Sequence, residues 1–285
     1  MRILAALLAC CSMSISAAGT DVYLFDRQNN YQFIANITDR DGYDNQPSFT
    51  LDNKSVLFTS DRAGGQTDIF MYDIQSGKTR NLTNTPEQNE YSAQPRSNDR
   101  FNYILQEGVP YQNLWHRTYK QGPSERALTS FVPAAYYAIN EKGVLFWGRY
   151  AFSLFFEPAG SNIGPAIGES LFVMDRAGRS IHPIPNSTKF SIVDKQMNGS
   201  WIVKSYDPDT KSITPMVFLG ADNEDYCWTP EGKMLRASGN VLMQFDPETD
   251  APWEELTTLN AKGFVKGGRC MVSKDGRYLA MVNTF

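Results

Sequence analysis

The sequence contains one phrase twice. Residues 67–83 read TDIFMYDIQSGKTRNLT, and residues 20–38 read TDVYLFDRQNNYQFIANIT. Each copy alternates apolar and polar residues, passes through a polar turn and ends in Leu-Thr or Ile-Thr, which is the pattern of a β-hairpin. The ending recurs at Thr38, Thr83 and Thr129, with spacings of 45 and 46 residues. A self-similar period of this length predicts a chain of stacked, equivalent units.

A second phrase alternates with the first. It consists of a short strand, a turn of Asn, Asp or Gly, and an apolar strand, and these turn residues tolerate the left-handed backbone of tight hairpins. Copies occur at residues 46–60, 93–106, 136–148, 190–205, 226–238 and 269–283. Each full unit therefore has four short strands, which is the composition of a β-propeller blade.

The count of units predicts an all-β, six-bladed β-propeller. Five blades begin near residues 44, 91, 134, 189 and 225, and the sixth has only the hairpin 269–283 before the sequence ends. Residues 21–38 have the pattern of the missing outer hairpin, so both ends of the chain are predicted to join in one composite blade that closes the ring. The segment 149–170 is predicted to be a long loop of blade three.

The first residues predict export. Residues 1–18 carry one positive charge and an apolar run too short to span a bilayer as a helix, and small residues at Ser16 and Ala18 suit cleavage of a signal peptide. A single propeller domain over residues 19–285 is then expected in the periplasm or outside the cell. Alternatively, the LLAC sequence ending at Cys10 forms a lipoprotein box in which Cys10 is acylated.

Charge and cysteine content narrow the function classes. The net charge of -4 and the lack of a Lys/Arg run exclude nucleic-acid binding through bulk positive charge. No segment after the leader is long and apolar enough for a transmembrane span. Cys227 and Cys270 remain after cleavage, and both a disulfide and two buried thiols are compatible with an exported protein.

Residues 47–83 resemble the WD40-like repeat of the TolB family. The resemblance rests on Pro47, the Ser60-Asp61-Arg62 triplet, the glycine pair Gly64-Gly65 and the Asp-Ile strand that follows. It implies a six-bladed propeller exported to the periplasm of a Gram-negative cell. TolB binds the peptidoglycan-associated lipoprotein through its propeller and TolA through an N-terminal segment. TolB also has an α/β domain before the propeller, for which this sequence has no counterpart between the predicted cleavage site and the first strand.

Aromatic residues favour a binding function. The connections between blades and those between second and third strands should emerge on one face, and tyrosine and arginine are enriched at contact surfaces. Phe155 is expected in the 149–170 loop, either protruding as an apolar anchor or folded back onto the ring. The sequence thus predicts a monomeric, non-enzymatic binding or scaffold propeller for a protein or peptidoglycan-associated envelope partner. The expected binding residues are Tyr43, Asn45, Tyr91, Tyr136, Arg149, Tyr150, Phe155 and Tyr226.

An alternative is a channel-mouth hydrolase or lyase acting on a saccharide or peptide. Asp44, Glu90, Asp222 and Asp225 precede inner strands, so their oxygens could gather at one mouth and hold Ca²⁺, or they could simply cap turns. No catalytic residue, metal ligand or cofactor is assigned. The two histidines, His116 and His182, are expected in the outer halves of their blades with structural roles. Asp61 and Arg62 are expected to tie strands or blades together.

Overall fold

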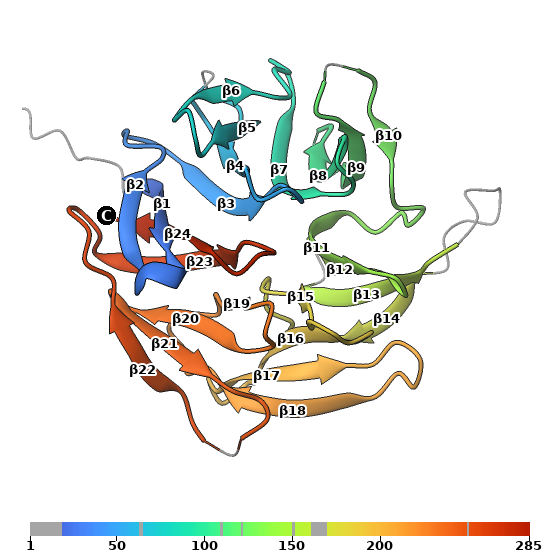
Figure 1. Ribbon diagram of the computed structural model, residues 1–285. Coiled ribbons are helices and arrows are strands. Elements are labelled where there is room, and N and C mark those ends of the chain that lie inside the picture. Colours follow the sequence, from blue (N-terminus) through green and yellow to red (C-terminus); the bar gives the residue numbers. More distant parts are fainter. Residues whose placement is uncertain are drawn as a thin grey trace, which may run out of the picture.

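A computed structural model shows six four-stranded antiparallel sheets arranged around a central channel (Figure 1). It describes residues 19–62, 65–108, 111–120, 122–149, 152–160, 170–249 and 251–285. The predicted signal peptide with Cys10, the glycine Gly64 and Tyr150 lie outside the described residues. In the described part the single helical element is the 3-10 turn η1 (Arg27–Asn29), and no helix there is long and apolar enough to cross a membrane. The predicted six-bladed propeller is confirmed.

The first three blades follow one another along the chain, each running from the innermost to the outermost strand. Blade one contains β3 (Asp44–Phe49), β4 (Ser55–Ser60), β5 (Asp68–Asp73) and β6 (Thr79–Asn81). Blade two contains β7 (Asn89–Pro95), β8 (Arg100–Gln106), β9 (Gln112–Thr118) and β10 (Glu125–Arg126). Blade three contains β11 (Ala134–Asn140), β12 (Gly143–Gly148), β13 (Ser153–Pro158) and β14 (Leu171–Met174).

Blades four and five complete the sequential part of the ring. Blade four contains β15 (His182–Pro183), β16 (Phe190–Lys195), β17 (Trp201–Tyr206) and β18 (Ile213–Phe218). Blade five contains β19 (Cys227–Trp228), β20 (Met234–Ser238), β21 (Val241–Phe245) and β22 (Glu254–Thr258). The predicted start of blade four near residue 189 is wrong, because the innermost strand is β15 and the hairpin from Phe190 forms the second and third strands.

The sixth blade joins the two ends of the chain, as predicted. It contains β23 (Lys266–Val272), β24 (Tyr278–Thr284), β1 (Thr20–Asp26) and β2 (Gln32–Asn36). Strands β1 and β24 pair along their whole length, from Thr20 opposite Thr284 to Asp26 opposite Tyr278. This pairing closes the ring without a covalent link.

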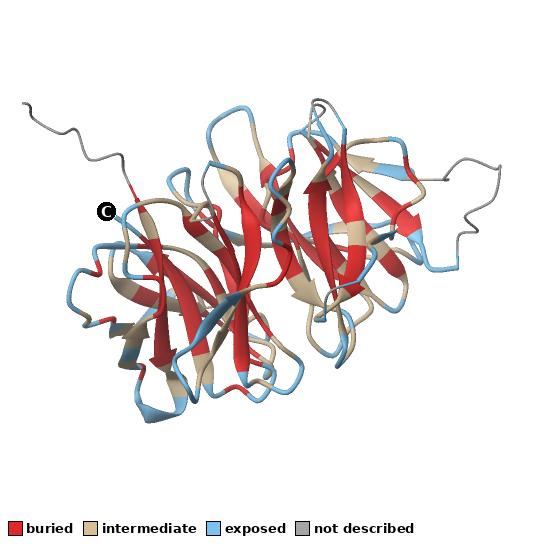
Figure 2. Cartoon of the chain, turned by 90° about the horizontal axis from the view of Figure 1, so that it is seen from above, coloured by how far each residue is buried: buried red, intermediate tan, exposed pale blue. Residues whose placement is uncertain are grey.

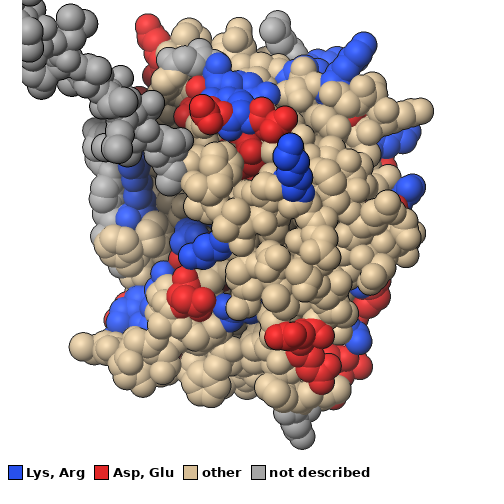
Figure 3. All heavy atoms as spheres, turned by 90° about the vertical axis from the view of Figure 1, so that its left-hand side faces the viewer, with Lys and Arg blue, Asp and Glu red and all other residues tan. Residues whose placement is uncertain are grey.

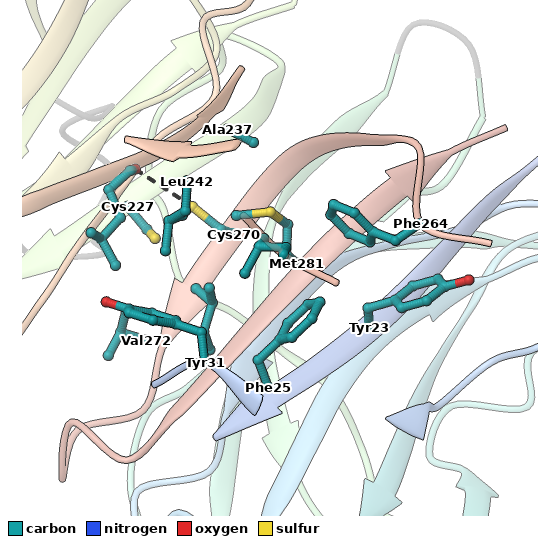
Figure 4. Packing of buried hydrophobic residues seen from close by; sticks show 13 residues of the cluster. Tyr23, Phe25, Tyr31, Cys227, Ala237, Leu242, Phe264, Cys270, Val272 and Met281 are labelled. Atoms are coloured by element: carbon teal, nitrogen blue, oxygen red, sulfur yellow. Dashed lines mark hydrogen bonds between the residues drawn. The ribbon is translucent and has the colours of Figure 1, made fainter. Parts of the chain in front are cut away.

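The core lies between neighbouring blades, whose central strands are buried (Figure 2). The cluster between blades five and six includes Phe25, Leu242 and Met281, with no exposed surface on any of them (Figure 4). Cys227 and Cys270 belong to this cluster as free, buried thiols, one from each of the two blades. Each blade is therefore apolar on both faces and is stable only when stacked against its neighbours.

A buried aspartate explains why the first phrase is repeated. In blade one the Asp68 carboxylate accepts hydrogen bonds from Thr83 Oγ1 at 3.0 Å, Asn81 Nδ2 at 2.8 Å and the Thr85 backbone N–H at 3.1 Å. Asn81 Oδ1 in turn accepts from the Thr83 backbone N–H at 3.1 Å. The network fixes the turn that follows the outermost strand and leads into the next blade.

The same network recurs in the closing blade. Asp21 accepts hydrogen bonds from Thr38 Oγ1 at 2.8 Å and from Asn36 Nδ2 at 2.7 Å. Asp21 and Asp68 are 4% and 0% exposed, respectively. The Thr-Asp beginning and the Asn-x-Thr ending of the phrase are thus the two halves of one hydrogen-bonded lock.

Ion pairs connect the closing blade to blade one, as expected for Asp61 and Arg62. Arg40 Nη2 lies 2.6 Å from Asp61 Oδ1, and Arg40 Nη1 lies 2.7 Å from the buried Asp44. Arg62 Nη2 reaches the other oxygen of Asp44 at 3.0 Å. These contacts join the chain after β2 to the first two strands of blade one.

Candidate functional site

One end of the channel widens into a cavity of about 670 Å³, here called the mouth cavity. The starts of the innermost strands meet there with the ends of the second strands, because every innermost strand runs away from this end. Gln106 at the end of β8, Trp147 near the end of β12 and Lys195 at the end of β16 all line it. The volume lies in the range of about 300 to 1,000 Å³ that is usual for ligand sites.

Aromatic side chains form much of the wall. Tyr43, Tyr91 and Tyr136 lie near the starts of three innermost strands, as predicted, and Trp147 and Phe152 belong to blade three. The Trp147 ring meets Tyr136 edge to face at 5.7 Å and Phe152 at 5.3 Å between ring centroids. Trp147 Nε1 donates a hydrogen bond to the Ala177 carbonyl at 2.9 Å. This bond fixes the indole ring between Tyr136 and Phe152.

A charged cluster from blades four and five forms another part of the wall. Arg179, just before β15, binds both acids that precede β19: Nη1 lies 2.5 Å from Glu224 Oε1, and Nη2 lies 3.0 Å from both Asp225 oxygens. Lys195 Nζ contacts the same Glu224 oxygen at 2.9 Å. Glu224 and Asp225 are nearly fully buried. The cluster therefore fixes the blade four to blade five connection at the edge of the cavity.

Two further arginines belong to the wall on the side of blade three. Arg149 follows β12, and its Nη1 donates to Gln112 Oε1 at 2.5 Å. Arg176 follows β14, is half exposed, and lies 3.6 Å from Asp175. Arginine can present two parallel N–H groups to a carboxylate or phosphate, so this side of the cavity is suited to anions.

Arg269 on β23 lines two smaller hollows that share Tyr136 and Arg179 with the mouth cavity. Its guanidinium lies 4.9 Å above the centre of the Tyr136 ring, and Nη1 donates to Asn45 Oδ1 at 3.2 Å. Asp225 lies 3.8 Å from Arg269 Nε. Burial raises the pKa of the neighbouring Tyr43 to about 12, so its hydroxyl keeps its proton and can donate a hydrogen bond at neutral pH.

The histidines do not come together. His116 is on β9, the third strand of blade two, as expected for the outer half of a blade. The expectation for His182 is wrong, because it lies on the innermost strand β15, where its ring packs edge to face on Tyr226 at 4.8 Å. Burial lowers the pKa of His182 to about 4, so the imidazole is neutral at pH 7.

The four acids considered for an enzymatic site each contact different partners. Asp44 is bound by Arg40 and Arg62, Asp225 by Arg179, and the exposed Asp222 lies 3.5 Å from Arg236. Glu90 is buried beside Thr85 and Asp68. Each of these four carboxylates therefore has partners of its own within the protein. In the described part of the chain, no group of three or more His, Cys, Asp or Glu side chains is arranged to hold a metal ion.

The other predicted binding residues are divided between the cavity and the core. Asn45 lies beside the cavity on Arg269. Tyr226 is only 1% exposed, and its hydroxyl donates to Ser191, so its expected place on the face is wrong. Phe155 lies in β13 and stacks on Phe146, so it is part of a sheet and not of a protruding loop.

Several cavity residues are not predicted by the sequence: Trp147, Arg176, Arg179, Lys195 and Glu224. Arg179 and Glu224 come from the connections before and after blade four, and Lys195 is the last residue of its strand β16. Arg176 and Arg179 lie together in the short sequence DRAGR between two strands, which is a local signal for a basic turn.

Comparisons with known proteins support the fold. No protein-family model matches the sequence, and no curated protein matches it significantly. A TolB-type protein from Agrobacterium tumefaciens superposes with a TM-score of 0.70 at 11% identity, over 94% of this chain and 99% of that one. TolB from Acinetobacter baumannii superposes with a TM-score of 0.57 at 11% identity, and the match covers 93% of this chain and 63% of the TolB chain. An oligogalacturonate lyase from Vibrio parahaemolyticus superposes with a TM-score of 0.53 at 11% identity, and the match covers 92% of this chain and 83% of the lyase chain. The chain thus has the fold of the TolB-type six-bladed propellers, as the sequence resemblance implied.

Proposed function

We propose that this chain is an exported, non-enzymatic binding propeller that contacts an envelope protein through the end of the ring that carries the mouth cavity. The observation that carries the proposal is the cavity itself, which combines aromatic walls with arginines at the centre of that end. Tyrosine, tryptophan and arginine are the residues that most often dominate the energy of protein interfaces. The TolB-type fold is consistent with a binding role, and the signal-like leader sequence favours the periplasm.

Exposed apolar side chains around the cavity support a protein partner. Phe152 is 61% exposed, and Phe131, in the connection that enters blade three, is 69% exposed. Tyr111 lies directly before Gln112 of the cavity wall and is 69% exposed. Val265 lies directly before β23 and is 61% exposed. Apolar groups around a concave centre are typical of a surface that another protein covers.

The charged residues on the outer side of the ring near the chain ends are of mixed sign. On the outer side near the chain ends, basic and acidic side chains are interspersed and separated by uncharged ones (Figure 3). Ion pairs on this part of the molecule, such as Arg27 with Glu231 at 2.9 Å, join blade six to blade five. Their positions indicate a structural role.

Replacing Phe152 by asparagine is expected to weaken partner binding. Phe152 has a φ of +48°, a left-handed conformation that asparagine accepts, so the fold should be retained while the ring is lost. Loss of an exposed aromatic anchor typically costs about 2 kcal/mol, or roughly thirtyfold in affinity. The measurement is capture from an envelope extract by the wild type and the variant, followed by identification of the captured protein and titration with it in purified form.

The control is Ile34→Asn on β2, the outermost strand of the closing blade, where the exposed fraction is 41%. It removes a comparable apolar group from the outer edge of the ring and should leave binding unchanged. Equal loss in both variants, or no specific capture by the wild type, would count against the proposed function.

A further inference from the structure

The innermost strands leave a second hollow at the end of the channel opposite the mouth cavity. This hollow has a volume of about 350 Å³ and is here called the lower pocket. Phe49, Pro95, Trp228 and Val272 line it, and they are the last residues of β3, β7, β19 and β23. Leu51, in the turn after β3, is 37% exposed and belongs to the same wall. A mostly apolar pocket of this volume is typical of a site for a small molecule.

A smaller hollow joins the lower pocket to the mouth cavity. It has a volume of about 80 Å³ and is here called the central chamber. It shares Gln94, His182 and Met271 with the lower pocket. It shares Gln46 and Tyr136 with the mouth cavity. Since one water molecule takes about 30 Å³ of liquid, the chamber has room for two or three waters or for one small polar group of a ligand.

A histidine nitrogen in the wall of the central chamber has no partner. His182 Nε2 is buried and makes no hydrogen bond within the described part of the chain. Burial lowers the pKa of His182 to about 4, so the ring is neutral at pH 7. A weaker, opposite effect on this pKa comes from a hydrogen bond with the Tyr226 backbone, as expected for a ring N–H that donates to a carbonyl. The nitrogen that donates is then Nδ1, and Nε2 is left as an acceptor.

A serine hydroxyl in the same wall is also buried and unpaired. Ser92 Oγ has no hydrogen-bond partner among the residues that the structure describes. The backbone of Ser92 is held on both sides, because its N–H donates to Gln46 Oε1 at 2.8 Å and its carbonyl accepts from Tyr137 Oη at 2.9 Å. Buried polar atoms are nearly always paired with protein or with bound water. The chamber thus offers one acceptor, His182 Nε2, and one hydroxyl to a molecule that enters it.

The chemistry of the two hollows together indicates the class of ligand. Water in the chamber would pair both polar atoms but would leave the apolar wall of the lower pocket hydrated, whereas an apolar body would remove that surface from water. The rings of Phe49 and Trp228 suit an aromatic body. Lys274 is the only charged side chain among the described residues of the lower pocket, and the polar atoms that need a partner in the chamber are neutral. A single hydroxyl group, which both donates and accepts, matches them.

We propose that the lower end of the channel binds a small aromatic molecule that carries one hydroxyl group. The rings of the ligand fill the lower pocket beside Trp228. Its hydroxyl enters the central chamber, donates a hydrogen bond to His182 Nε2 and accepts one from Ser92 Oγ. The site lies at the opposite end of the ring from the proposed protein contact and does not depend on it.

The test uses 2-naphthol as the probe and 2-methoxynaphthalene as the matched probe, which has the same rings but no O–H group. Titration of the full chain, followed by NMR signals of the probe, should show about fivefold tighter binding of 2-naphthol, because one further hydrogen bond is made. 2-Naphthoate, which has an anionic group in place of the hydroxyl, should bind more weakly. Equal binding of the first two probes, tighter binding of 2-naphthoate, or no binding at all would overturn the inference. The last result is the one expected if water alone occupies the chamber.

His182→Phe tests the hydrogen bond separately from the apolar contact. Phenylalanine retains a ring that can pack on Tyr226, as His182 does at 4.8 Å, but it has no acceptor. The variant should bind 2-naphthol about fivefold more weakly and 2-methoxynaphthalene as well as the wild type does. A preference for 2-naphthol that persists in His182→Phe would contradict the assigned contact.

Leu51→Asn tests the pocket without changing a buried residue. It removes an apolar side chain from the rim of the lower pocket and should weaken both naphthalene probes by about tenfold. The matched control is Leu256→Asn on β22, the outermost strand of blade five, where the exposed fraction of 40% is similar and binding should not change. Losses of the same size in these two variants would show that the lower pocket is not the site.

Phe152→Asn separates this site from the mouth cavity. Phe152 lines the mouth cavity, so its replacement should leave the affinity for 2-naphthol unchanged. Loss of 2-naphthol binding in Phe152→Asn with retention in Leu51→Asn would place the probe in the mouth cavity and refute the inference. Capture of an envelope protein is measured independently of the naphthalene probes, so failure of this inference and failure of the proposed function are distinguishable.

Discussion

Replacing Asp68 by alanine is expected to lower the free energy of unfolding by about 3 to 4 kcal/mol. The carboxylate is fully buried and accepts hydrogen bonds from Thr83, Asn81 and the backbone of Thr85. Alanine would leave these buried donors without an acceptor, and an unmade buried hydrogen bond costs more than a made one contributes. Urea unfolding of the purified chain, followed by tryptophan fluorescence, measures the change.

Two variants show whether this loss belongs to the repeated lock. Asp21→Ala removes the equivalent carboxylate from the closing blade and should destabilise the chain by a similar amount, because Asp21 makes the matching contacts with Thr38 and Asn36. Asp175→Ala removes an exposed carboxylate and should change the free energy of unfolding little. If Asp68→Ala proved as mild as Asp175→Ala, the lock would not explain the repeat.

Replacing Glu90 by glutamine is expected to stabilise the protein at alkaline pH. Burial, with a smaller contribution from the Asp68 carboxylate, raises the pKa of Glu90 from 4.5 to about 8. The folded state therefore binds a proton more tightly than the unfolded state. The stability that this proton contributes is fully present below about pH 4.5 and is lost as the pH rises to about 8, by roughly 5 kcal/mol.

Glutamine resembles the protonated form of Glu90 and does not titrate. Glu90→Gln should therefore match the wild type in free energy of unfolding near pH 5 and exceed it near pH 9. The control Glu125→Gln changes a carboxylate whose side chain is 59% exposed and should track the wild type at both values. Parallel curves for Glu90→Gln and the wild type between pH 5 and pH 9 would show that Glu90 titrates normally.

Most of the ring was predictable from the sequence because the repeat has a physical cause. The Asp68 lock needs Asp at the start of the third strand and Asn-x-Thr beginning at the last residue of the fourth, and both patterns are visible in the sequence. The copy at residues 20–38 has no inner hairpin before it and pairs instead with β24. Closure by the two ends of the chain follows from counting hairpins.

The sequence misplaces the start of blade four because the innermost strand of this blade is too short to show a pattern. Strand β15 has two residues, His182 and Pro183, which pair with Ser191 and Phe190. Two residues cannot show alternation, so the sequence pattern predicts the apolar strand from Phe190 as the innermost. The sequence predicts a loop in place of strand β13 for a related reason. Leu154 and Phe156 on one face and Phe155 on the other are all apolar, so the run does not alternate.

The site was predicted in part. Tyr43, Tyr91 and Tyr136 occupy similar places near the starts of inner strands, so the repeat brings them to one cavity. Arg179 and Glu224 belong to different connections, and only the ring places them 2.5 Å apart. Local sequence contains no signal for a contact of that kind.

The contact surface can be tested directly by photo-crosslinking in cells. A photoreactive phenylalanine analogue at position 152, at the rim of the mouth cavity, should give a specific adduct with one envelope protein. The same analogue at position 34, on the outer edge of the closing blade, should give none. No adduct from position 152, or the same adduct from both positions, would contradict the claim that the partner docks at the mouth of this propeller.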